Sequence, residues 1–139
     1  MPSRNDFKNM AKTRLKEVKL LYEHGYFDGA NYLSGYVIEA ALKARICKIL
    51  NQDYPDNGAL KSAYFIHDID RLIILAGLQK DLDNRKPNGA FNANWSLVTQ
   101  WDQTYRYNVN VVNKQMVEDV LTALEDKTNG IFTWIKKKW

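Results

Sequence analysis

Four side chains of types that bind ligands or transfer protons stand out in this sequence, namely Glu39, Lys43, His67 and Arg106. Glu39 and Lys43 are four residues apart in an apolar stretch, so a helix there places both on one face. A carboxylate among apolar side chains and tyrosines is costly to bury alone, and an arginine is a suitable partner for it. We therefore expect Glu39 and Arg106 to meet in a shared pocket.

Each of these residues also has a purely structural interpretation. Glu39 and Lys43 would form a favourable surface pair, worth roughly 0.2–0.5 kcal/mol if exposed. His67 would cap a helix, and Arg106 would bond to loop carbonyls or to Glu39 while its flanking tyrosines fill the edge of the core. The residue types alone leave structural pairing and ligand binding both open.

The stretch from Gly25 to Leu50 is the element that must position Glu39 and Lys43. Small and apolar residues recur in it every three or four positions, which predicts a core helix that other helices approach closely. A second line of residues runs beside the first with the same spacing. The first line is Ala30, Leu33, Val37, Ala40, Ala41 and Ala44, and the second is Tyr32, Tyr36, Glu39, Lys43 and Ile46.

Helical patterns flank this central stretch on both sides. Residues 6–23 have an apolar stripe opposite lysines, which predicts an amphipathic helix ending at Gly25. Turn-forming residues fill 51–58, including Asp56-Asn57-Gly58. Asp68 is a suitable N-cap for a short helix that ends at Gly77.

The second half of the chain is less regular. The polar stretch 80–94 predicts a loop with one helical turn at 80–84, and residues 95–107 predict a shorter helix. A last helix begins at about Lys114, with an interruption expected at 129–130. No strand-like alternation and no repeat occurs. We therefore predict a single all-α domain over 1–139, an up-and-down bundle of four main helices plus short helices.

Composition sets broad limits on the class of protein. The chain has 139 residues and a formal net charge of +4, and its first 24 residues hold six basic and three acidic side chains. That basic face either contacts phosphates or is simply solvated. No apolar run has the length of a membrane span or the form of a signal peptide, so we expect a cytoplasmic protein with no membrane contact. The single cysteine, Cys47, is expected to be a buried apolar thiol.

Several common enzyme motifs are absent from the sequence. It has no Gly-rich phosphate loop, no HExxH, no paired-cysteine ligand set and no nucleophile elbow. With two histidines, a metal site would depend mainly on carboxylates, so we expect no metal and no cofactor.

An ordered set of short motifs resembles a known family. The motifs are Gly25-Tyr26-Phe27-Asp28-Gly29-Ala30, GYVIEAALKA over 35–44, His67-Asp68-Ile69, Leu75-Ala76-Gly77-Leu78 and Tyr105-Arg106-Tyr107. Together they resemble the HEPN domain, the higher-eukaryote and prokaryote nucleotide-binding domain, over most of the chain. The resemblance implies a HEPN-like helical bundle that forms homodimers. It also implies a partner, a minimal nucleotidyltransferase, in a toxin–antitoxin or phage-defence system.

Several HEPN proteins cut RNA without a metal, through an arginine followed after four to six residues by a histidine. Arg106 matches that arginine, but the histidine positions hold Val111, Val112 and Asn113. The resemblance therefore predicts a member without the usual ribonuclease motif.

We expect the chain to bind a nucleotide or RNA near Tyr36, Glu39, Lys43, Arg106 and Tyr107. One alternative is a metal-independent ribonuclease that uses Arg106 with His67 or Glu39 as catalytic residues. Another is a non-enzymatic interaction module that partners a minimal nucleotidyltransferase.

Overall fold

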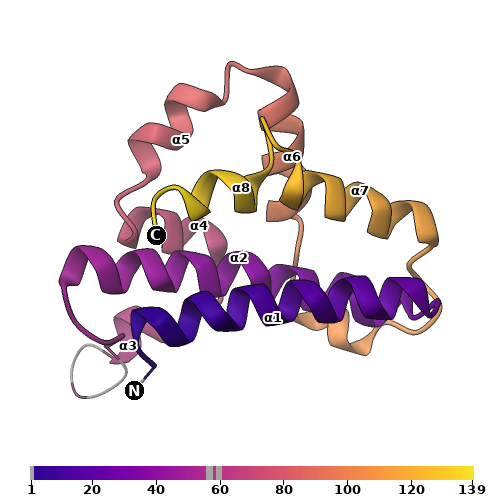
Figure 1. Ribbon diagram of the computed structural model, residues 1–139, viewed down its shortest axis with the longest axis horizontal. Coiled ribbons are helices and arrows are strands. Elements are labelled where there is room, and N and C mark those ends of the chain that lie inside the picture. The colour runs from indigo at the N-terminus through magenta and orange to yellow at the C-terminus, as the bar shows by residue number, and fades with distance from the viewer. Residues whose placement is uncertain (1, 56–57, 59–60) are drawn as a thin grey trace.

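Two long antiparallel helices lie side by side along the longest axis of the molecule (Figure 1). The structure, a computed structural model, describes residues 2–55, 58 and 61–139. The first helix is α1 (Arg4–Glu23) and the second is α2 (Phe27–Leu50). Gly25 has a φ of +81°, a left-handed conformation that ends α1 where the sequence predicts.

Shorter helices follow α2. They are α3 (Lys61–Tyr64), α4 (Ile69–Leu75), α5 (Gln79–Arg85), α6 (Gly89–Thr99), the 3-10 helix η2 (Gln103–Tyr107), α7 (Lys114–Glu125) and α8 (Ile131–Lys136). The described residues contain no β-strand, and the predicted all-α class is confirmed.

The contacts of α2 make it the central element of the fold. It packs against α1, α4, η2, α7 and α8. Fourteen of its 24 residues are buried, so neighbouring elements cover it on most sides. Glu39 and Lys43 are among the buried residues, so the interpretation of these two as a surface pair is wrong.

The helix that follows His67 begins and ends as the sequence predicts. The side chain of Asp68 accepts hydrogen bonds from the backbone N–H groups of Asp70 and Arg71, and so caps α4. Gly77 has a φ of +68°, and the N–H of Leu78 donates to the carbonyl of Ile73 at 3.1 Å. His67 is therefore held directly before a capped helix.

The region from 80 to 107 differs from the prediction. Residues 80–94 are mostly helical, because α5 extends to Arg85 and α6 begins at Gly89. The side chain of Asn88 caps α6 by accepting from the N–H groups of Ala90 and Phe91. The helix predicted over 95–107 is wrong, since α6 ends at Thr99 and η2 begins only after Asp102. The chain leaves the helix where the Trp101 indole N–H donates to the Tyr32 carbonyl at 2.8 Å.

The predicted interruption of the last helix is confirmed. Asn113 caps α7, and the backbone turns at Gly130 before α8. A Cβ at Gly130 would lie 2.5 Å from the carbonyl oxygen of Asp126, so this tight turn has no room for a side chain. Arg4 donates to the backbone oxygen of Trp139, which ties the start of α1 to the end of the chain.

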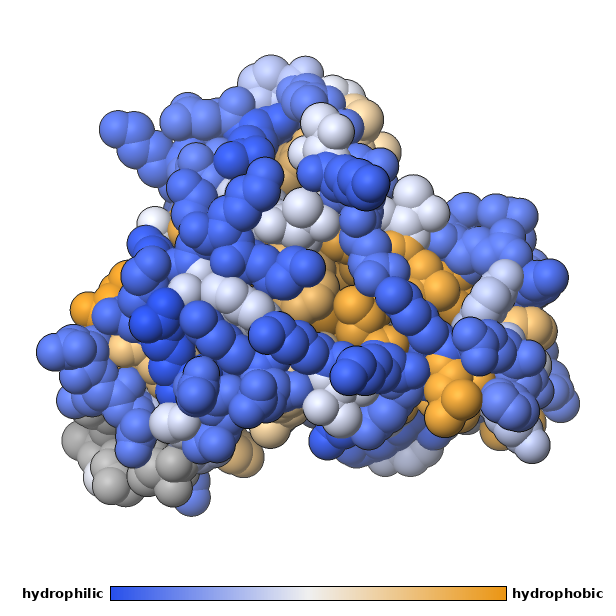
Figure 2. Space-filling view, viewed as in Figure 1, coloured by the Kyte–Doolittle hydropathy of each residue, from blue (hydrophilic) through white to orange (hydrophobic). Residues whose placement is uncertain are grey.

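The face shown in Figure 2 is mostly hydrophilic, with hydrophobic residues gathered in the space between α1 and α7. No helix in the described ranges is both long enough and apolar enough to cross a membrane. The predicted turn over 51–58 begins with Asn51 in a left-handed conformation, at a φ of +53°. Its residues 56 and 57 lie outside the described residues.

Candidate functional site

Glu39 is the centre of a buried polar cluster. Its Oε1 accepts a hydrogen bond from Lys43 Nζ at 2.9 Å and another from His67 Nδ1 at 2.6 Å. Glu39 is 4% exposed and Lys43 is 9% exposed. Glu39 and Lys43 lie on one face of α2 because they are four residues apart. His67, which is 28 residues from Glu39 in the sequence, comes from the segment before α4.

The arrangement determines the hydrogen position on His67. An ionised carboxylate can only accept, so the Nδ1 that faces Glu39 carries the hydrogen. The ring also lies edge-on to Tyr36 at 6.4 Å and to Phe65 at 6.0 Å, which holds it in place.

The second carboxylate oxygen of Glu39 has no such partners. Oε2 is buried and has no hydrogen-bond partner among the described residues. A buried acceptor without a donor destabilises a protein by about 1–3 kcal/mol, so buried polar atoms are normally paired. The surrounding residues also leave Oε2 almost no accessible surface, so this oxygen does not open onto a cavity.

Glu39 and Lys43 line an apolar cavity of about 270 Å³. The cavity lies where the start of α1 meets the middle of α2, and Phe65, which also lines it, is 63% exposed. Aromatic rings dominate its walls, and the Glu39–Lys43 pair supplies the charged groups. Its lining residues are Pro2, Phe7, Met10, Tyr36, Glu39, Ala40, Lys43, Tyr54 and Phe65.

Two tyrosines of this cavity are held in their neutral form. Burial raises the pKa of Tyr36 to about 12, and the hydrogen bond with Tyr32 and the charge of Glu39 add to the effect, while Arg106 opposes it. Burial also raises the pKa of Tyr54, with a further contribution from Glu39. Both hydroxyls therefore stay protonated at neutral pH.

Arg106 does not pair with Glu39, and the expectation that the two meet in one pocket is wrong. Arg106 lies on the exposed η2 helix, where its Nη2 donates to the Tyr107 hydroxyl at 3.0 Å and its guanidinium lies 4.9 Å from the Tyr107 ring centre. His67 takes the place at Glu39 that the sequence analysis assigned to Arg106. Residue types alone could not distinguish these two partners.

A second cavity, of about 240 Å³, lies on the other side of His67. Three carboxylates line it, from Asp68, Asp70 and Asp102. A phosphate next to His67 would meet these negative charges, which oppose the binding of an anion. Across the described ranges, no three His, Cys, Asp or Glu residues are placed to hold one metal ion.

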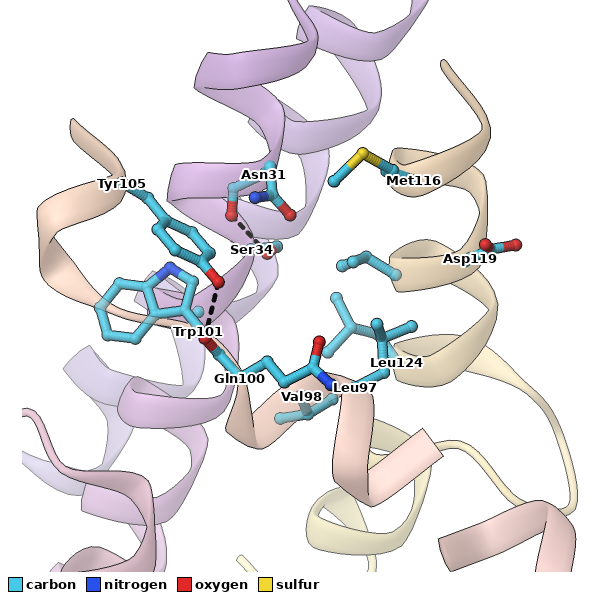
Figure 3. A pocket seen from close by; sticks show the side chains of 12 residues that line it. Asn31, Ser34, Leu97, Val98, Gln100, Trp101, Tyr105, Met116, Asp119 and Leu124 are labelled. Atoms are coloured by element: carbon cyan, nitrogen blue, oxygen red, sulfur yellow. Dashed lines mark hydrogen bonds between the residues drawn. The ribbon is translucent and has the colours of Figure 1, made fainter. Parts of the chain in front are cut away.

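A third cavity, of about 110 Å³, lies between α2, the end of α6 and α7 (Figure 3). Trp101 lies against α2 on one side of it, and Tyr105 stands above, with its hydroxyl donating to the Gln100 carbonyl. Asp119 on α7 points away from the cavity. The walls of this third cavity are mostly apolar. Trp101, which forms part of them, packs on the central helix α2.

Four cations gather at the end of the molecule where α1 begins, namely Arg4, Lys8, Lys12 and Lys48. Burial lowers the pKa of Lys8, and the positive charges of the other three lower it further. Arg4, Lys8 and Lys48 line a polar cavity of about 440 Å³. The basic character of the first helix was visible in the sequence, whereas the contribution of Lys48 from α2 was not.

Of the residues that the sequence singled out, the structure brings Tyr36, Glu39, Lys43 and His67 together. It places Arg106 and Tyr107 on the exposed η2 helix, where Arg106 is near enough to Tyr36 to oppose the rise of its pKa but makes no contact with Glu39. Sequence reasoning missed the aromatic residues that α1 and the segment after α2 contribute to the cavity, because no local pattern marks them. Comparisons with family models, with curated proteins and with solved structures found no match.

Proposed function

We propose that this chain binds a nucleotide or RNA at the end of the molecule where α1 begins and α2 ends. One observation carries the proposal: the buried pair of Glu39 and Lys43 lines a cavity whose walls are mostly aromatic. A flat ring with polar groups at its edge would pack against the aromatic walls beside this charged pair. Nucleobases are rings of this kind.

The position of the cations supports a ligand that also carries phosphate. Arg4 and Lys8 come from the first turns of α1 and Lys48 from the last turn of α2. The start of α1 also lines the apolar cavity, through Phe7 and Met10, together with the middle of α2. A nucleotide joins a ring to a phosphate, so one ligand could use both surfaces.

The proposal extends to the partners that the HEPN-like motifs imply. A second copy of the chain and a minimal nucleotidyltransferase would assemble with it in a toxin–antitoxin or phage-defence setting. The mass of the purified chain in solution tests the homodimer directly. Co-purification with a nucleotidyltransferase encoded beside it tests the second partner, and a monomer that binds neither would contradict this part.

The decisive experiment measures binding of nucleoside monophosphates and of a short single-stranded RNA at several salt concentrations. Affinity should fall as salt rises, because cations released from phosphate contribute to binding. Changing Lys8 and Lys12 to glutamine should reduce the salt slope for RNA by about 1 for each of these lysines that binds a phosphate. The matched control changes Lys80 and Lys86, two lysines outside the cationic end.

Two results would contradict the proposal. Absence of binding to every nucleotide and RNA tested would favour the interaction module. If binding survives in the Lys8 and Lys12 variant but is abolished in Arg106→Ala, then the phosphate binds at η2 and not at the start of α1.

A further inference from the structure

The cations at the start of α1 follow one another along a single face of the helix. Arg4, Lys8 and Lys12 are each four residues apart, so the helical rise places neighbours about 6 Å apart along the axis. Lys8 and Lys12 both lie over the Trp139 ring, with Nζ 5.3 and 5.7 Å from its centroid. Lys48, from the last turn of α2, lies near enough for its charge to act on Lys8. We call Arg4, Lys8, Lys12 and Lys48 the cationic row.

No aspartate or glutamate neutralises the cationic row. Within the part of the chain that the structure describes, none of its members forms an ion pair with a side-chain carboxylate. Arg4 and Lys48 bond instead to backbone oxygens of residues 138–139. Arg14 and Lys19, further along the same helix, do form ion pairs. Like charges held together in this way repel one another, and a bound anion relieves the repulsion.

A polar cavity of about 440 Å³ lies beside the cationic row. Arg4, Lys8 and Lys48 line it, and Asp53 is the one acidic side chain among its described lining residues. Burial and the neighbouring positive charges lower the pKa of Lys8, so the charges around this space add to one another. An anionic ligand is therefore favoured here.

The packing of α1 favours a nucleic-acid strand over an anionic membrane surface. A basic helix that binds membranes must also insert an apolar face. The apolar face of α1, formed by Phe7, Ala11, Leu15 and Val18, is buried, and α1 packs along α2. Helix α1 therefore offers only its charges, and the cavity beside them suits a narrow strand better than a flat surface.

The length of the cationic row distinguishes a strand from a single nucleotide. Arg4 and Lys12 are eight residues apart, so the row extends over about 12 Å of α1. The phosphates of one nucleotide stand alone or are joined directly to one another, and they reach only part of this length. A strand repeats its phosphates with a sugar between them, so it presents one charge to each cation in turn.

We infer that the cationic row binds successive phosphates of one single-stranded RNA, up to one for each of its four cations. Arg4, Lys8 and Lys12 follow the strand along α1, and Lys48 approaches it from α2. Contacts to phosphates carry no sequence information, so this surface sets the length of strand bound and not its sequence. The inference rests on the proposed function, whose ligand it specifies as a strand and not a mononucleotide.

The experiment measures binding of single-stranded RNAs of one to eight nucleotides by titration calorimetry. Affinity at low salt should rise up to about fivefold with each added phosphate, as expected of an exposed ion pair. The rise should level off at about one nucleotide for each cation of the row. For the longest strand, the logarithm of the binding constant should fall with the logarithm of salt concentration with a slope of about −2 to −3, at about −0.7 for each phosphate.

Lys48→Gln is the sharper test, because Lys48 lies on a different helix from the rest of the row. Loss of one cation should reduce the salt slope by about 0.7 and move the levelling-off to a strand one nucleotide shorter. The matched control is Lys86→Gln, which removes an exposed lysine outside the row and should change neither quantity. Thermal melts establish that both variants are folded. The length series uses wild-type protein, so it does not depend on the folding of any variant.

The outcomes separate this inference from the proposed function. Equal affinity for mononucleotides and longer strands, or equal effects of Lys48→Gln and Lys86→Gln, overturns the strand and leaves nucleotide binding in place. A nucleoside triphosphate that binds as tightly as the longest strand also overturns it, in favour of directly joined phosphates. Tighter binding to vesicles of anionic phospholipid than to any RNA moves the row to a membrane surface. Absence of binding to every nucleotide and RNA overturns both proposals.

Discussion

At the scale of the residue, the notable feature is a carboxylate that is buried, charged and shared between two partners. Glu39 bonds to Lys43 and His67 through one oxygen and leaves the other without a partner among the described residues. Pairs like this one often contribute little net stability, because removing both charges from water is costly. A buried pair of this kind is therefore weak evidence for stability.

Removing one partner of this pair should be strongly destabilising. We expect Lys43→Met to lower the free energy of unfolding by about 3 kcal/mol, since it leaves a buried carboxylate without its ammonium. Urea unfolding followed by circular dichroism measures the change. The double variant Lys43→Met with Glu39→Gln should recover part of the loss, because both charges are then gone.

The matched control is Lys19, which pairs with Glu125 at 2.7 Å on the surface. Lys19→Met should change the free energy of unfolding by less than about 1 kcal/mol, because water screens an exposed pair. If Lys43→Met and Lys19→Met lowered the free energy of unfolding equally, burial of the Glu39 pair would add nothing to the cost of breaking it.

At the scale of the element, the fit between α2 and Trp101 determines how the second half of the chain packs. A Cβ built on Gly35 would lie 2.0 Å from a ring carbon of Trp101, so the indole lies directly against the helix backbone. The ring also contacts Tyr36, with its centre 5.1 Å away. Gly35 is therefore a packing requirement within a helix that would otherwise favour alanine.

Gly35→Ala should displace this ring. We expect the free energy of unfolding to fall by about 1–3 kcal/mol, since the overpacking outweighs the gain of about 1 kcal/mol in helix propensity. Urea unfolding gives the energy, and the near-ultraviolet circular dichroism spectrum reports the altered Trp101 environment.

Gly29→Ala is the control in the same helix. Its Cβ would meet only Leu21, at 3.5 Å, which is an ordinary contact. This variant should leave stability unchanged or raise it by up to about 1 kcal/mol. If both alanine variants were equally stable, the proposed role of Gly35 would be wrong.

At the scale of the whole molecule, one carboxylate joins the start of α2 to the segment that leads into α7. Asp28 accepts hydrogen bonds from the backbone N–H groups of Asn110, Val111 and Val112, at 2.7, 3.0 and 3.0 Å. The bond from Val112 contributes most to lowering the pKa of Asp28 below its ordinary value of 3.8. This contact connects residues more than 80 positions apart in the chain.

The lowered pKa predicts a dependence of stability on pH. The folded chain binds the proton of Asp28 less readily than the unfolded chain does, so the contribution is full above about pH 4 and is lost as the pH falls through the lowered value. Asp28→Asn should therefore reduce the free energy of unfolding by about 1–2 kcal/mol at pH 7. The difference from wild type should shrink below about pH 4.

Unfolding by urea at pH 7 and at pH 3 measures this difference. Asp83→Asn serves as the control, because Asp83 is exposed and, among the described residues, its side chain bonds only to Gln79 in its own helix. If the difference in free energy of unfolding between wild type and Asp28→Asn did not change with pH, the contact of Asp28 with the backbone of residues 110–112 would not explain it.

Much of the fold could be predicted from local patterns. The apolar stripe of α1, the two lines of α2, the cap at Asp68 and the stops at Gly25 and Gly77 depend on residues close in the sequence, and the structure confirms them. The prediction failed over 80–107, where α6 ends and the chain turns because Trp101 packs on Gly35, 66 positions earlier in the sequence. Local propensity carries no information about a contact of that kind.

The candidate site, too, was predictable only in the part that depends on residues close in the sequence. Helical spacing alone determined that Glu39 and Lys43 share a face, because four residues make about one turn of any α-helix. Only the tertiary structure decided that His67, and not Arg106, completes the cluster, and that aromatic residues from α1 and the segment after α2 enclose it. Which of two cations meets a carboxylate depends on the path of the chain between them, and that path is set by the packing of the whole core.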